Sequence, residues 1–146
     1  MSDGCQLNKQ YNLFIGNDEA IIFKVSSQPK LYAEISMNYV IVEVAKKDRP
    51  RLGKYKVSTR WYRYGILDHR QREILSYQWH PGTEIDFPHL HVHSLEKCHL
   101  PTGRVSIEQF VRLLIDDFDV KPKKGCDWKV VLKETEDKFK SYRTWP

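Results

Sequence analysis

A run of alternating histidines is the part of this sequence best suited to chemistry. Five of the six histidines lie within residues 80–99, and residues 88–93 read Pro-His-Leu-His-Val-His. Successive side chains of a β-strand point to opposite faces, and residues two apart lie about 6–7 Å from each other. The spacing therefore predicts that His89, His91 and His93 form a row on the surface, while the aliphatic residues between them face the core.

Imidazole titrates near neutral pH, so such a row can supply a general acid and a general base. His91 and His93 are the expected pair. His89 is a third catalytic candidate, placed after these two because it follows a proline and lies near the strand edge. Neutral imidazoles also bind zinc or another divalent transition metal. That alternative uses His89, His91 and His93, or two of these together with His80. Solvent-exposed histidines without a role are the remaining interpretation.

The loop Thr102-Gly103-Arg104 leads into a predicted helix and is a candidate phosphate site. A helix N-terminus carries a positive dipole end that favours anions. Gly103 allows close backbone approach, and Arg104 can hold a phosphate by two parallel hydrogen bonds. The alternative is an ordinary loop with its arginine in solvent.

The central hairpin mixes basic and aromatic residues, a composition that can bind single-stranded RNA by stacking and phosphate contact. The residues are Arg60, Trp61, Tyr62, Arg63, Tyr64, Arg70 and Arg72. Core aromatics beside solvated arginines would produce the same pattern. A non-catalytic RNA- or protein-binding module is therefore a further alternative.

These residues must be positioned by strands in the first two thirds of the chain. Segments rich in β-formers predict a hairpin of residues 11–15 and 20–25, a strand at 39–44, and a charged loop at 46–53. A second hairpin joins 55–66 to 73–79, and the histidine segment 89–94 adds a third strand to this meander.

The last third of the chain predicts two helices. Ser106 and Gln109 form a capping box, and an apolar stripe follows at helical spacing. Asp127 can cap a last helix with a stripe of Trp128, Val131, Leu132 and Phe139. Strands followed by helices predict an α+β fold: an antiparallel β-sheet of hairpins and meander, with two C-terminal helices packed on one face.

Length and composition predict a single domain, residues 1–146, with enough chain to bury a core without disulfides. The formal net charge of +5 is compatible with a phosphate-bearing partner. There is no apolar run long enough for a membrane span and no signal-peptide pattern. Three widely spaced cysteines indicate a reducing compartment, so a cytoplasmic location is expected.

The segment 89–93 is similar to the histidine-triad pattern of nucleotide hydrolases, in which histidines alternate with apolar residues. That resemblance implies that His91 attacks the α-phosphate of a nucleotide. A β-hairpin precedes the motif in this chain, where that family has a helix.

A broader stretch, residues 55–115, resembles the small TumE-type toxins of bacterial toxin–antitoxin modules. Tyr62-Arg63-Tyr64, a turn, an aromatic strand and a Phe-Pro-His-x-His segment at residues 87–91 carry the resemblance. It implies action on RNA or on nucleotide transfer, and an antitoxin protein as partner.

The leading hypothesis is a metal-independent ribonuclease-like enzyme of bacterial toxin type, without a cofactor, acting on RNA or a nucleotide. His91 and His93 would be the acid and base, while Arg104 and Arg63 stabilise the charge of the phosphorane. The runner-up is a transition-metal-binding protein.

Overall fold

The computed structural model describes residues 6–15, 21–23, 31–95 and 98–142 of the chain. Within these residues, seven strands form one sheet in the order β1-β3-β4-β5-β6-β7, with β2 also paired to β3. The strands are β1 (Gln10–Ile15), β2 (Ile21–Phe23), β3 (Leu31–Glu43), β4 (Tyr55–Leu67), β5 (Glu73–Trp79), β6 (His89–Val92) and β7 (His99–Pro101). All of these pairings are antiparallel.

β3 and β4 form the long centre of the sheet because both are rich in β-branched and aromatic residues. The predicted hairpin of β4 and β5 is confirmed. Asp68 closes its turn by accepting hydrogen bonds from the backbone N–H groups of Arg70 and Arg72. The Arg72 backbone hydrogen bond is the main cause that lowers the pKa of Asp68 to about 2. This turn therefore sets the register between β4 and β5.

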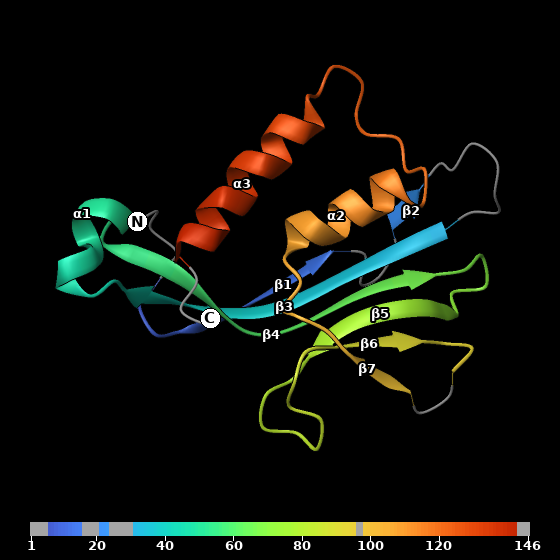
Figure 1. Ribbon diagram of the computed structural model, residues 1–146, viewed down its shortest axis with the longest axis horizontal. Coiled ribbons are helices and arrows are strands. Elements are labelled where there is room, and N and C mark those ends of the chain that lie inside the picture. Colours follow the sequence, from blue (N-terminus) through green and yellow to red (C-terminus); the bar gives the residue numbers. More distant parts are fainter. Residues whose placement is uncertain (1–5, 16–20, 24–30, 96–97, 143–146) are drawn as a thin grey trace.

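Two C-terminal helices, α2 (Ile107–Asp116) and α3 (Trp128–Tyr142), lie on the same side of the sheet (Figure 1). The predicted capping box of Ser106 and Gln109 is present at the start of α2. Phe110 and Leu114 of α2 pack on Tyr62 and Tyr64 of β4 in the main core. The α+β fold with two C-terminal helices on one face is thus confirmed.

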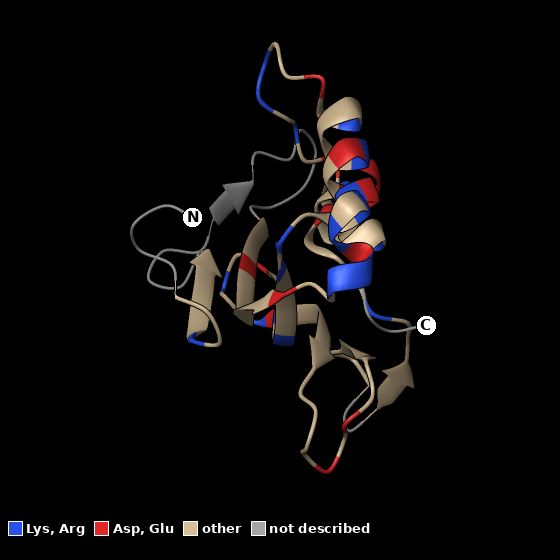
Figure 2. Cartoon of the chain, turned by 90° about the vertical axis from the view of Figure 1, so that its left-hand side faces the viewer, with Lys and Arg blue, Asp and Glu red and all other residues tan. Residues whose placement is uncertain are grey.

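The outer surfaces of the helices carry mixed charge. Figure 2 shows basic and acidic segments alternating along the helices, and Lys133 forms an ion pair with Asp137 of α3 at 3.0 Å. α3 is joined to α2 by Arg112, whose guanidinium lies 3.3 Å from the Glu136 carboxylate. The predicted stripe of α3 is only partly correct: Leu132 is buried, whereas Val131 is 50% exposed. None of the helices in the described part of the chain has the length and apolar character needed to cross a membrane.

The predicted N-terminal hairpin is wrong. β1 and β2 both pair with β3, where Ile15 lies opposite Ile35 and Ile21 lies opposite Ala33. β2 therefore continues the line of β1 along the same edge of β3, which is long enough to pair with both. The turn expected at residues 16–19 lies outside the described residues.

The segment 46–53, predicted as a loop, contains the short helices η1 (Lys46–Asp48) and α1 (Arg49–Leu52). Pro50 lies in the first turn of α1, where a missing N–H costs nothing. Arg49 links α1 to the end of β3. It donates a hydrogen bond to the Val44 carbonyl and forms an ion pair with Glu43 at 2.7 Å.

Alternation along the strands gives the sheet two chemically different faces. The face under α2 carries Tyr62, Tyr64 and Trp79. The opposite face, called the open face below, carries the cross-strand sets Arg63–Gln78–His89 and Gly65–Ser76–His91–His99. The strand histidines His89, His91 and His99 therefore lie on the side of the sheet away from the helices.

Candidate metal centre

Three histidines from two neighbouring strands converge on the open face. Antiparallel pairing of β6 with β7 places His91 opposite His99, and His89 lies two residues before His91 on the same face. The ring centroids of His91 and His99 are 4.4 Å apart, and those of His89 and His99 are 5.1 Å apart. One ring nitrogen from each of the three lies within 4.8 Å of the other two. In the described chain, this is the one group of His, Cys, Asp and Glu side chains that meets the geometry of a metal site.

His89 is held in a single orientation. Its side chain is buried, with 3% exposure, and its Nδ1 lies 2.8 Å from the Phe87 carbonyl oxygen. A carbonyl only accepts hydrogen bonds, so Nδ1 carries the proton and Nε2 presents a lone pair. The His89 Nε2 lies 3.0 Å from the His91 Nε2, which therefore donates in this contact. An outer nitrogen bound to a backbone carbonyl is the usual arrangement of metal-ligating histidines.

His91 is kept neutral by its surroundings. Partial burial is the main cause that lowers its pKa below the ordinary value, and electrostatic interactions with His99 and His89 lower it further, against an opposing effect of Glu73. Neutral imidazole is the form that binds a metal. The site is thus biased toward ligation and against the accumulation of charged imidazolium groups.

The distances are close to those that a tetrahedral zinc ion requires. With Zn–N bonds of about 2.0–2.1 Å, two ligand nitrogens lie about 3.4 Å apart. The contact between His89 and His91 is 3.0 Å, and the widest separation in the group is within 4.8 Å. His99, the third member of the group, lies on the short edge strand β7.

Arg63 occupies the middle of the open face but is engaged by carboxylates. Its guanidinium forms ion pairs with Glu34 at 3.0 Å and with Glu73 at 2.7 Å. This predicted phosphate-binding residue shares a face with the histidines. A phosphate would have to compete with two carboxylates for it.

His93 does not belong to the cluster. The predicted strand 89–94 ends at Val92, and His93 is an exposed residue of the following turn. The expected surface row of His89, His91 and His93 is therefore wrong in two respects, since His89 is buried and His93 leaves the strand. The reason is a turn in which the Leu95 N–H donates to the Val92 carbonyl, so that the chain bends directly after Val92.

His80 lies close to the cluster without joining it. It follows β5, and its ring stacks on Trp61 with centroids 5.4 Å apart. Burial lowers the pKa of His80, and the charges of His89 and Arg63 add to that shift. His80 therefore shares the electrostatic environment of the site as a neighbour.

The predicted phosphate loop lies on the other side of the sheet. The Arg104 guanidinium stacks over the Trp79 ring, 3.3 Å from its centroid, and Trp79 belongs to the helix-covered face. Thr102 and Gly103 line a hollow there beside α2. The sheet thus separates Thr102, Gly103 and Arg104 from the histidines. The structure does not bring the predicted phosphate-binding loop together with the predicted catalytic histidines.

His99 is the site residue that the sequence interpretation missed. A signal for it was present: a turn centred near Leu95 pairs residue 91 with residue 99. Residues 99–101 are too short to be recognised as a strand by composition. Interpreting the segment as a hairpin rather than a single strand would have placed His99 opposite His91.

Comparison with protein-family models, with curated proteins and with solved structures gave no match. What this chain does must therefore be inferred from the chemistry of the site itself.

Proposed function

We propose that this protein binds a divalent transition-metal ion, with zinc the best fit, through His89, His91 and His99. The convergence of three ring nitrogens, one of them oriented by the Phe87 carbonyl, carries this proposal. Nitrogen ligands select zinc, copper, iron or nickel over magnesium and calcium. Zinc requires no further protein ligand when water occupies the fourth position.

Three histidines and an open fourth position are typical of hydrolytic zinc sites. When bound, such an ion lowers the pKa of its water ligand to about 7 and supplies a nucleophile at neutral pH. We propose a hydrolase acting on phosphodiester bonds of RNA or a nucleotide, because the net charge of +5 suits a phosphate-bearing substrate. The chain's own groups then have clear tasks: the Phe87 carbonyl holds the His89 ring in its ligand orientation, and the Arg63 ion pairs keep the neighbouring face ordered. A cytoplasmic location belongs to the same proposal.

Zinc titration of the untagged, chelator-treated protein tests the metal site. The wild-type protein should bind one zinc ion per chain, measured by calorimetry and elemental analysis. His99→Ala should weaken binding by about 10²-fold or more, because a two-histidine site loses most of its affinity. His93→Ala is the matched control and should bind as the wild type does. Failure of the wild type to bind zinc, or equal binding by His99→Ala, would refute the proposal.

Metal-independent acid–base catalysis is the second candidate, and the hydrogen bond between His89 and His91 is the observation that favours it. Two imidazoles in direct contact can exchange a proton. In this version His91 remains the central residue, and His89 takes the place of the predicted partner His93, which lies outside the cluster. RNA cleavage that survives chelation and falls with His91→Ala and with His89→Ala would favour it over the zinc site. Binding of RNA or of an antitoxin protein without cleavage, weakening steeply with salt, would instead indicate a non-catalytic module.

A further inference from the structure

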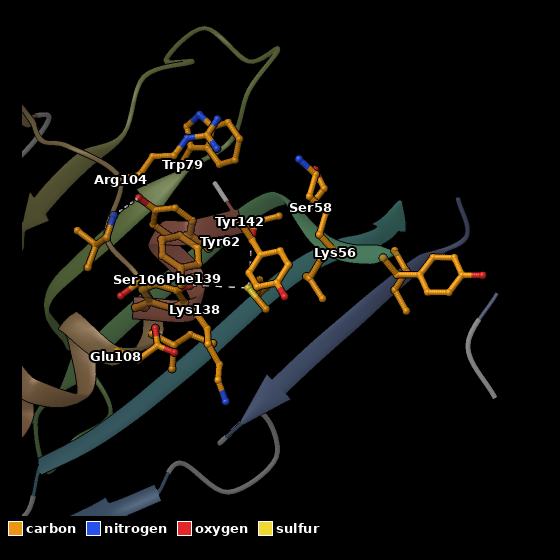
Figure 3. A pocket seen from close by; sticks show the side chains of 18 residues that line it. Lys56, Ser58, Tyr62, Trp79, Arg104, Ser106, Glu108, Lys138, Phe139 and Tyr142 are labelled. Atoms are coloured by element: carbon orange, nitrogen blue, oxygen red, sulfur yellow. Dashed lines mark hydrogen bonds between the residues drawn. The ribbon is translucent and has the colours of Figure 1, made fainter. Parts of the chain in front are cut away.

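A second candidate site lies on the helix-covered face of the sheet. A cavity of about 480 Å³ opens between the central strands and the helices α2 and α3 (Figure 3). This volume lies within the range of pockets that hold small organic molecules. Apolar side chains form much of its lining, among them Met37, Ile41, Val57, Tyr62, Trp79 and Phe139.

The aromatic wall of this cavity is rigid. Tyr62 and Tyr64 stack with ring centroids 4.7 Å apart, and Trp79 lies 6.1 Å from Tyr62. The Tyr62 hydroxyl accepts a hydrogen bond from the Val105 N–H at 3.0 Å. The Trp79 indole N–H donates to the Asp86 carbonyl at 3.1 Å. These contacts hold flat apolar surfaces in place, so a ligand would not have to order them.

Positive charge gathers at the same cavity. The Arg104 guanidinium stacks on Trp79 at one end of it, and partial burial lowers the Arg104 pKa below its ordinary value (Figure 3). Lys56 and Lys138 also belong to the described lining, against the single carboxylate of Glu108. A partly dehydrated guanidinium beside an apolar chamber favours an anion with an apolar body. Its planar fork matches a carboxylate in particular.

We propose that this cavity binds a small carboxylic acid with a ring-bearing apolar body. The carboxylate lies beside the Arg104 guanidinium, and the apolar body fills the space beside Tyr62 and Phe139. This ligand site is separate from the histidine cluster, because Trp79 and His89 lie on opposite faces of the sheet. It can therefore hold whether or not the metal proposal does.

Two probes of the same shape test the site: 2-naphthoate, which is charged, and 2-naphthalenemethanol, which is neutral. Chelator is present throughout, so a failure of the metal proposal does not affect the result. Calorimetry should show saturable binding of one naphthoate per chain and binding of the alcohol weaker by about tenfold or more, as expected for a charge-assisted hydrogen bond. Backbone amide NMR shifts should concentrate at residues 55–59 and 104–108.

Arg104→Gln should reduce the preference for the acid to less than about threefold, while binding of the alcohol is retained. Arg70→Gln is the matched control, because Arg70 is exposed in the turn between β4 and β5. The wild-type comparison is decisive even if Arg104→Gln fails to fold. Equal binding of acid and alcohol by the wild-type protein, or no saturable binding of either, would overturn the proposal.

Discussion

His89 shows how a polar side chain is accommodated in a nearly dry position. An imidazole with 3% exposure is costly unless its nitrogens are hydrogen-bonded, and His89 has partners for both. A bound metal ion would replace only the contact with His91 and leave the Phe87 carbonyl contact intact. The proposed metal site would therefore be close to its ligand-binding geometry before any ion arrives.

His80 gives a pH dependence to folding. Burial, followed by the charges of His89 and Arg63, holds its pKa below the ordinary value of 6.5. Just below pH 6.5 the unfolded chain therefore binds a proton that the folded chain excludes, and the free energy of unfolding falls as the pH decreases through this window. Above that window His80 makes no contribution. The loss of stability on acidification should shrink in His80→Asn.

Urea unfolding of the metal-free protein at about pH 7.5 and about pH 5.5 measures this effect. His69→Asn is the control, because His69 is exposed in the turn between β4 and β5. An acid-induced loss of the same size in His80→Asn and the wild type would show that His80 is not responsible.

At the scale of elements, the hairpin of β6 and β7 decides which histidines meet. His91 lies opposite His99, whereas Leu90 lies opposite Leu100 on the other face. Since side chains alternate along a strand, exchanging His99 and Leu100 moves the imidazole of β7 to the opposite face of the sheet. Leu100 is 40% exposed, so the exchange disturbs little packing.

The double substitution His99→Leu with Leu100→His should therefore lose zinc binding by about 10²-fold while the chain stays folded. Leu100→His alone keeps His99 and should bind zinc as the wild type does. Calorimetric titration of both variants checks this. Undiminished zinc binding by the exchanged variant would mean that strand pairing does not orient the third ligand.

Across the whole molecule, the two faces of the sheet carry different kinds of side chain. Histidines, carboxylates and Arg63 lie on the open face, while the helices cover aromatic residues and the cavity at Arg104 on the other. The three proposed ligands come from two strands that are adjacent only in the folded chain. Metal binding should therefore be coupled to folding.

Zinc at 100 times its dissociation constant should stabilise the folded state by about 2.7 kcal/mol. For a chain of this size that raises the unfolding temperature by roughly 5–10 °C. Thermal unfolding followed by circular dichroism, with zinc or with chelator, measures the shift. His99→Ala should show almost none, and a full shift in that variant would place the ion elsewhere.

Much of the fold could be predicted because its signals are local. The capping box of Ser106 and Gln109, the apolar stripe of α2 and the hairpin of β4 and β5 each depend on residues near one another in the sequence. The two open-face residues His89 and His91 were likewise found from period-two alternation. These features follow from backbone geometry that depends only on residues close together in the sequence.

The amino-acid sequence by itself determined the α+β class, the two C-terminal helices and a histidine-bearing strand. Only the tertiary structure decided that β1 and β2 share the edge of β3, that His99 and not His93 completes the cluster, and that Arg104 lies across the sheet from it. Each of these depends on which segment pairs with a strand, in what register, and on which face a residue then occupies. A shift of one residue reverses that face, so the pattern within a single strand does not determine it.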